Sequence, residues 1–429
     1  MTLAAAIFGL TYLAIVTEKV DRTAVALAGG LSLIFLGVLS QKQAVEAIDF
    51  NTLGLLVGMM VLVNVLRQTG VFRYVGIRTA RLAGGRPWPV MLGFALFTAV
   101  ASAFLDNVTT VLLMMPITLT IAEHLRVDAR PMLVSQVVAS NVGGTATLIG
   151  DPPNILIGSA VGLSFVDFLA NLTPVVLVIL ALTSASFWLV WGRKAPDGPG
   201  LAALADLDER TTITNYPLLY RSLAVLGLTI LGFLLHGPLH LEPASVAMAG
   251  ATILVLVGRV SIHRALEEVE WGTILFFVGL FVVVGALEKV GLLGLAARLV
   301  VDLTGGNLIV TVLAVLWFAA LASAIVDNIP AVASLIPVVF AVARLTHPGV
   351  PDEALTHLPD VLPLWWALAL GACLGGNATL VAASANVVVA GAASRRGEKI
   401  TFWGFTKVGL PITLVSLVVA SAYLYLRYL

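Results

Sequence analysis

The chain has 429 residues, of which 59% are apolar and 11% are charged, and its formal net charge is zero. This composition is typical of proteins embedded in a lipid bilayer and excludes a soluble globular domain of useful size. The zero net charge predicts no nucleic-acid partner. The single cysteine, Cys373, excludes a disulfide framework and a cysteine-rich metal site.

Apolar runs recur along the chain at a length suited to membrane crossing, which takes about 20 residues per helix. The first run, at 3–16, lacks a positively charged start and a clear cleavage site, so we expect a retained helix and not a signal peptide. The first half is predicted to contain helices near 3–17, 23–39 and 51–66, a hairpin at 88–122 bent at Asp106-Asn107, a broken helix at 131–160 and a long helix at 165–192.

A polar stretch at 193–216 follows and is predicted to be a cytoplasmic linker between two halves, 1–192 and 217–429. The second half repeats the order of the first. Its predicted elements are helices near 217–235, 243–258 and 271–287, a hairpin at 307–344, a broken helix at 364–393 and a last helix at 403–428.

Direct comparison of the two halves indicates an internal duplication. An offset of 221 residues maps SAFLDNVTTVLLMMP at 102–116 onto SAIVDNIPAVASLIP at 323–337. Downstream the offset becomes 232, where GGTATLIGDPPN at 143–154 faces GGNATLVAASAN at 375–386. Duplicated units of about five helices are a common way to build transporters.

Each half contains five crossings plus one hairpin. A hairpin adds two crossings or none, so the total is odd and the second half is inserted upside down. Placing the N-terminus outside puts 19 of the 24 basic residues on the cytoplasmic side, as the positive-inside rule favours. We therefore expect an all-α polytopic protein of the inner membrane, with two inverted repeats of five transmembrane helices and both termini in the periplasm.

Each half also contains two interruptions in its apolar runs, one at the hairpin bend and one in the broken helix. Broken backbone at membrane depth occurs only where protein or a water-filled cavity satisfies its polar groups. The four interruptions therefore predict one polar site. The residues expected to bind substrate there are Asp106, Asn107, Thr109, Thr110, Gly143, Gly144, Thr145, Thr147, Asn154, Asp327, Asn328, Gly375, Gly376, Asn377, Thr379 and Asn386.

Proton coupling is assigned to Asp106, Asp327 and Asp151, because ionisable groups inside a membrane are costly and usually functional. A simpler interpretation remains open for each, since aspartate commonly caps a helix. The glycine pairs could equally reflect close helix packing. Cys373 lies near the second break, where a lone cysteine usually serves as a small apolar residue. No Gly-Lys-Ser/Thr follows the glycines, which excludes a nucleotide-binding loop.

The strings GGTATLIGDPPN, LDNVTT and VDNIPA together resemble the ion transporter superfamily, in particular its ArsB/NhaD group of arsenite/antimonite permeases, sodium/proton antiporters and P protein-like members. The resemblance covers nearly the whole chain. It implies an elevator mechanism and often a homodimer, with a transport domain from 88–192 and 307–429 and a scaffold from 1–66 and 217–287.

The resemblance leaves the cargo between two small inorganic solutes. We favour proton-coupled efflux of arsenite or antimonite, because neutral arsenous acid needs hydrogen-bonding groups and not a charged clamp. Sodium/proton antiport is the alternative, since sodium would accept carboxylate and carbonyl ligands. Asp-Asn at both bends, where citrate and dicarboxylate members carry Ser-Asn-Thr, argues against a carboxylate cargo. No cofactor, metal centre or enzymatic residue set is predicted, and a structural scaffold or anion transporter is less favoured.

Overall fold

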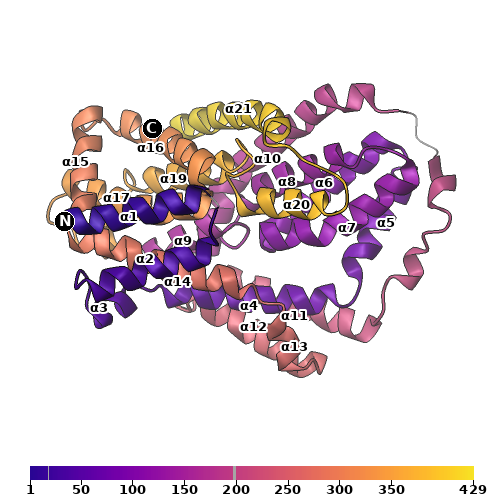
Figure 1. Cartoon of the computed structure of the whole chain (residues 1–429), viewed down its shortest axis with the longest axis horizontal. Helices are drawn as coiled ribbons and strands as arrows, with labels where there is room; N and C mark the ends of the chain where they lie inside the picture. Colours follow the sequence, from indigo (N-terminus) through magenta and orange to yellow (C-terminus); the bar gives the residue numbers. More distant parts are fainter. Residues whose placement is uncertain (18, 197–199) are drawn as a thin grey trace.

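The computed structural model describes residues 1–17, 19–196 and 200–429 (Figure 1). The described residues form helices and turns and contain no β-strand. Nine of these helices are long and apolar enough to cross a bilayer. The first half contains α1 (Thr2–Thr17), α2 (Arg22–Phe35), α3 (Gln41–Glu46), α4 (Phe50–Arg67), α5 (Val71–Leu82), α6 (Pro87–Phe104), α7 (Asn107–Leu125), α8 (Arg130–Gly144), α9 (Pro152–Val161) and α10 (Phe165–Val190).

Three short 3₁₀ turns at Gly192–Lys194, Gly200–Leu204 and Glu209–Thr211 lie in the stretch that joins the halves. The second half contains α11 (Tyr216–Leu235), α12 (Pro243–Gly258), α13 (Ile262–Glu267), α14 (Trp271–Lys289), α15 (Leu292–Thr304), α16 (Leu308–Val326), α17 (Asn328–Thr346), α18 (Asp352–Leu355), α19 (Leu362–Gly375), α20 (Ser384–Ser394) and α21 (Phe402–Tyr428).

The two halves correspond helix by helix once α18 is set aside. Helices α1 to α10 pair in order with α11 to α17 and α19 to α21. The short helix α18 occupies the insertion that changes the sequence offset from 221 to 232. The predicted duplication is therefore present in the structure, with both breaks at the expected places.

The halves interlock. Helix α2 packs against α14, and α4 packs against α12, so each repeat supplies a helix to the pair formed with the other. The same exchange recurs deeper in the fold, where α7 contacts α20 and α9 contacts α17. Figure 1 shows the hairpin of α6 and α7 in the right half of the view and the hairpin of α16 and α17 in the left half, so the two point toward each other.

Helices α5 and α15 follow α4 and α14 and were not predicted from the sequence. Each begins after a glycine in the left-handed conformation, Gly70 at φ 82° and Gly291 at φ 75°. Both helices are amphipathic, with charged residues such as Arg78 and Arg298 on the polar face. Because polar and apolar residues alternate along these helices, they contain no continuous apolar run and are not predicted as membrane helices.

Both chain termini lie toward the left of the molecule in Figure 1, whereas the described parts of the joining stretch, 192–196 and 200–215, lie toward the right. This arrangement agrees with an odd number of crossings per half. That the right end faces the cytoplasm remains a prediction from the positive-inside rule. We expect a reporter that is active only in the periplasm to work when fused after Leu429 and to be silent when inserted at Ala205. The reverse pattern would overturn the predicted orientation.

Candidate functional site

The hairpin bends place an aspartate at the start of each second arm. Asp106 precedes α7, and its carboxylate accepts hydrogen bonds from the backbone N–H of Thr109 at 2.9 Å and the Thr109 hydroxyl at 3.0 Å. Asp327 precedes α17 and accepts from the N–H of Ile329 at 3.1 Å. Both aspartates therefore act as helix N-caps, as the simpler interpretation predicted. This role leaves other carboxylate lone pairs free for additional partners.

The two bends differ in backbone conformation. Asp106 has φ −58°, whereas Asp327 has φ 98°, a left-handed value that is unfavourable for any residue with a Cβ atom. Such a conformation costs about 1–3 kcal/mol and persists where surrounding contacts hold it. The N–H of Asn328 donates to the carbonyl of Ala382 at 3.1 Å, which ties this bend to the second broken helix.

Equivalent asparagines hold the unwound stretch open in both broken helices. Asn154 donates through Nδ2 to the carbonyls of Thr145 at 3.1 Å and Thr147 at 2.8 Å. Its repeat partner Asn386 donates to the carbonyls of Gly376 at 2.8 Å and Thr379 at 3.0 Å. These bonds replace helical partners that the break removes, so both amides have a structural role.

Threonines and serines then join each broken helix to the hairpin of its own repeat. The Thr147 hydroxyl donates to the carbonyl of Ala103, and the Thr379 hydroxyl donates to that of Ala324 at 2.8 Å. Ser102 and Ser323 make a second equivalent pair, donating to the carbonyls of Ser140 and Ala372 at 2.8 and 2.7 Å. The same hydrogen bonds therefore connect the hairpin to the broken helix in each repeat.

Asn141, on α8, links the two repeats through amide groups. Its Oδ1 accepts from Nδ2 of Asn107 at 3.2 Å, and its Nδ2 donates to Oδ1 of Asn377 at 2.9 Å and of Asn386 at 3.1 Å. All four residues are at most 2% exposed. The first hairpin bend and both breaks therefore meet in one buried network.

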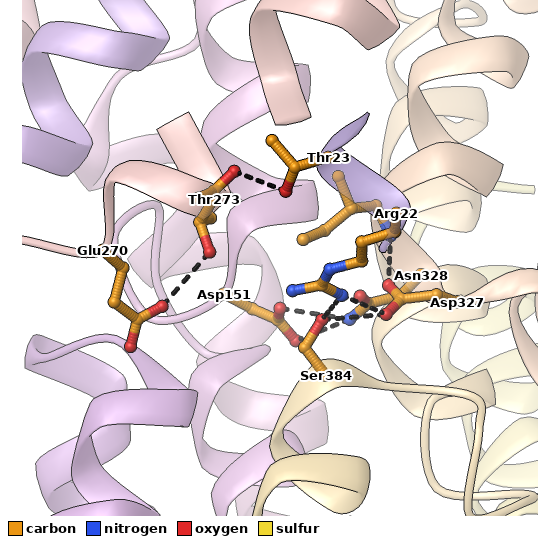
Figure 2. A network of polar contacts seen from close by, with 10 residues as sticks. Arg22, Thr23, Asp151, Glu270, Thr273, Asp327, Asn328 and Ser384 are labelled. Carbon is orange, nitrogen blue, oxygen red and sulfur yellow. Dashed lines mark hydrogen bonds and ion pairs between the residues drawn. The ribbon is translucent and has the colours of Figure 1, made fainter. Parts of the chain in front are cut away.

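A second network contains the charged groups (Figure 2). Nδ2 of Asn328 lies 3.2 and 3.4 Å from the two carboxylate oxygens of Asp151. The hydroxyl of Ser384 donates to Oδ2 of Asp327 at 2.8 Å. Arg22, the first residue of α2, approaches both: its Nη1 lies 2.6 Å from the Ser384 hydroxyl and 3.4 Å from Oδ2 of Asp327.

Asp151 is fully buried at the start of α9, yet its side chain makes no capping hydrogen bond. It faces Asn328 of the other repeat instead, which disfavours the simple capping interpretation. Cys373 lies beside it, with Sγ 3.5 Å from Oδ1 of Asn154. In the repeat alignment Ala383 corresponds to Asp151, and Asn141 corresponds to Cys373. The polar centre is therefore asymmetric although the fold is duplicated.

Two buried polar atoms in the first hairpin have no partner among the described residues, Oδ1 of Asn107 and the hydroxyl of Thr110. Both side chains are at most 2% exposed. Unmade hydrogen bonds of this kind are costly inside a protein, by about 1–3 kcal/mol each. These atoms are available to a bound solute.

The predicted glycines have a packing role. A Cβ atom on Gly143 would lie 2.1 Å from the Ala99 carbonyl oxygen, and one on Gly375 would lie 2.6 Å from that of Ala320. These contacts let α8 and α19 pack closely against α6 and α16. A Cβ atom on Gly144 would lie 2.5 Å from the carbonyl oxygen of Gly150, whereas one on Gly376 would meet its nearest atom at 3.1 Å. Direct contact with substrate remains a prediction for all four.

The structure thus brings residues from both hairpin bends and both breaks to one buried centre, and their binding of substrate remains a prediction. The sequence prediction does not include Asn141 or Ser384, and it interprets Cys373 as a small apolar residue. The sequence pattern does not single out Arg22 either, because it lies in the short polar stretch between the first two apolar runs. Glu270, at the start of α14, is also near enough to Asp106 to repel it electrostatically.

Among the described residues, no group of three or more metal-ligating side chains occurs.

The fold and this buried polar centre are those of a polytopic membrane transporter. The family model described as citrate transporter matches residues 12–371. The chain belongs to this family, within the ion transporter superfamily that its motifs resemble.

Relatives agree with this assignment. A protein of Mycobacterium bovis named an uncharacterized transporter is 43% identical, covering 99% of this chain and 98% of the relative. The human P protein is 34% identical over 99% of this chain and 59% of its own length. Among solved structures, the YdaH transporter of Alcanivorax borkumensis shares the fold with a TM-score of 0.59 at 17% identity, covering 99% of this chain and 98% of that one.

Proposed function

We propose that this protein is a proton-coupled secondary transporter that exports arsenite or antimonite as the neutral trihydroxide. The observation that supports this best is the charge balance of the buried centre. Asp106, Asp151, Asp327 and Glu270 surround it, and within the described part of the chain Arg22 is the one basic side chain that contacts them. Such a centre repels anions and accepts protons, cations or neutral polar solutes.

Proton coupling follows from the cost of burial. An isolated carboxylate in a low-dielectric environment is unfavourable and takes up a proton or a cation unless it is paired. Asp151 has an amide and a thiol as its neighbours and no cationic partner among the described residues. A proton that binds at one stage of the cycle and leaves at another would couple solute export to the proton gradient.

The neutral part of the site suits arsenous acid. This solute needs hydrogen-bond donors and acceptors, and Oδ1 of Asn107 and the Thr110 hydroxyl have no partner in the described part of the chain. Cys373 supplies one thiol nearby. A single thiol favours weak and reversible binding, which a carrier must have in order to release its load.

The movement would follow the predicted division of the chain. The hairpins and broken helices, 88–192 and 307–429, would slide as a transport domain along the scaffold of 1–66 and 217–287, in a homodimer. Polar side-chain contacts that join the two parts would have to break during this movement, and they include the ion pair of Arg22 with Asp327 at 3.4 Å and the hydrogen bond of Arg22 to Ser384 at 2.6 Å. Tyr12 bonds to the carbonyl of Pro330 at 3.0 Å, and Asn51 bonds to the Ser159 hydroxyl at 3.0 Å.

Sodium/proton antiport is the second candidate, and the excess of carboxylates over basic groups favours it. A sodium ion prefers the oxygen ligands that these carboxylates and the unwound backbone offer. The family description names citrate, but the same excess disfavours a tricarboxylate anion. The Asp-Asn pairs at both bends support the same conclusion.

Purified protein in liposomes with an imposed pH gradient tests the proposal. Arsenite, antimonite, sodium and citrate are each added while the internal pH is followed, with protein-free liposomes as the control. We expect arsenite and antimonite to dissipate the gradient and to be carried uphill by it. Dissipation by sodium alone would establish the antiporter, and transport of citrate alone would refute both candidates.

A further inference from the structure

The two hairpin bends occupy different electrostatic environments. Asp327 lies beside the guanidinium group of Arg22, whereas Asp106 accepts hydrogen bonds from Thr109 and lies within electrostatic range of the Glu270 carboxyl group. The sequence explains the difference, because Pro243 corresponds to Arg22 in the other repeat, and Pro152 corresponds to Ser384. Neither proline can supply an equivalent donor.

Arg22 is held in place from three directions. The Ser384 hydroxyl accepts from Nη1 and can at the same time donate to Asp327, so the three groups form a connected chain (Figure 2). The guanidinium carbon also lies 5.3 Å from the centre of the Phe276 ring, a favourable cation–π distance. The Arg22 side chain is 33% exposed and that of Asp327 is 11% exposed. The guanidinium group therefore extends from the more exposed part of the site toward the more buried carboxylate.

We propose that Arg22 is a resident cation that selects the coupling ion: it occupies the place on Asp327 that a transported monovalent cation would otherwise take. The other carboxylates of the centre, Asp106, Asp151 and Glu270, then remain to exchange protons. This inference rests on the proposed proton coupling and adds a specificity-determining residue to it. Arg22 belongs to α2, whereas Asp327 and Ser384 belong to the second hairpin and the second broken helix.

Sodium binding to purified protein tests this role without any transport assay. We measure the midpoint of thermal unfolding in sodium chloride and in choline chloride at equal ionic strength. The wild-type midpoint should be the same in both salts. Arg22→Gln leaves the Asp327 carboxylate without its cation, and we expect about 100 mM sodium to raise its midpoint by about 2 °C or more. Arg22→Lys keeps the charge and should behave as wild type.

Two further variants locate the bound ion. The double variant Arg22→Gln/Asp327→Asn removes both charges and should lose the sodium response. Arg22→His changes charge with pH near about 6.5, so its response should be absent below that pH and present above it. This variant keeps the carboxylates near residue 22, which are Asp327, Asp151 and Glu270. If Arg22→Gln does not fold, the appearance of the sodium response in Arg22→His at high pH takes its place in the test.

A sodium response in wild type, or none in Arg22→Gln and in Arg22→His at high pH, would overturn the assignment. So would a response that survives in the double variant, since sodium would then bind elsewhere. Failure of the proposed function is distinguishable from these results. If sodium stabilises only Arg22→Gln and the neutral form of Arg22→His, and wild type does not transport arsenite, the role of Arg22 is retained. The proposed arsenite cargo is then rejected.

Discussion

Replacing Asp151 with asparagine is expected to abolish proton-driven transport while leaving the protein folded. The side chain is fully buried between the two repeats and accepts from Nδ2 of Asn328. Asparagine has nearly the same size and still offers an acceptor oxygen, but it cannot bind and release a proton. An uncharged amide is also cheaper to bury than a carboxylate, so the variant should reach the membrane.

The measurement is uphill solute movement in liposomes with an imposed pH gradient, beside solute exchange with no gradient. Uphill movement by the variant should fall to the level of protein-free liposomes, whereas exchange should continue. Asp49→Asn is a matched control, because Asp49 caps α4 and asparagine is an equally good cap. Full proton-driven transport by the Asp151 variant would show that coupling resides elsewhere.

Replacing Gly143 with alanine is expected to disrupt folding. The added Cβ atom would lie 2.1 Å from the Ala99 carbonyl oxygen, which is backbone and cannot rotate away. The close contact between α8 and α6 would have to open, and overpacking of this kind costs about 1–3 kcal/mol or more. The loss should be seen as a lower thermal midpoint or as aggregation during size-exclusion chromatography in detergent.

Gly227→Ala on α11 is the control for this substitution. A Cβ atom there would meet no atom within 4 Å, and alanine favours a helix more than glycine does. Its midpoint should be unchanged or slightly higher. A Gly143 variant that is as stable as wild type would remove the packing explanation and favour a direct role for this glycine in the site.

Much of the fold was accessible from the sequence because membrane crossing imposes a simple pattern. Apolar runs, the repeat offsets and the Asp-Asn bends located the hairpins and broken helices to within a few residues. Prediction failed at α5 and α15, whose amphipathic composition resembles that of an ordinary loop. It also extended the second helix to residue 39, whereas α2 ends at Phe35 and a turn at Gly37, with φ 73°, leads away from it.

The sequence by itself determined which backbone segments are interrupted, because clusters of glycine, proline and polar residues within an apolar run leave backbone groups that lipid cannot satisfy. Only the tertiary structure decided which polar groups meet. The partnerships of Asn141 with Asn377, Asp151 with Asn328 and Arg22 with Asp327 join residues 177 to 305 positions apart. The repeat pattern does not predict these pairs, because in each pair at least one residue is aligned with a different residue type in the other half. They depend on the interlocking of the two repeats, which brings hairpins from opposite ends of the molecule to one buried centre where every polar group needs a partner.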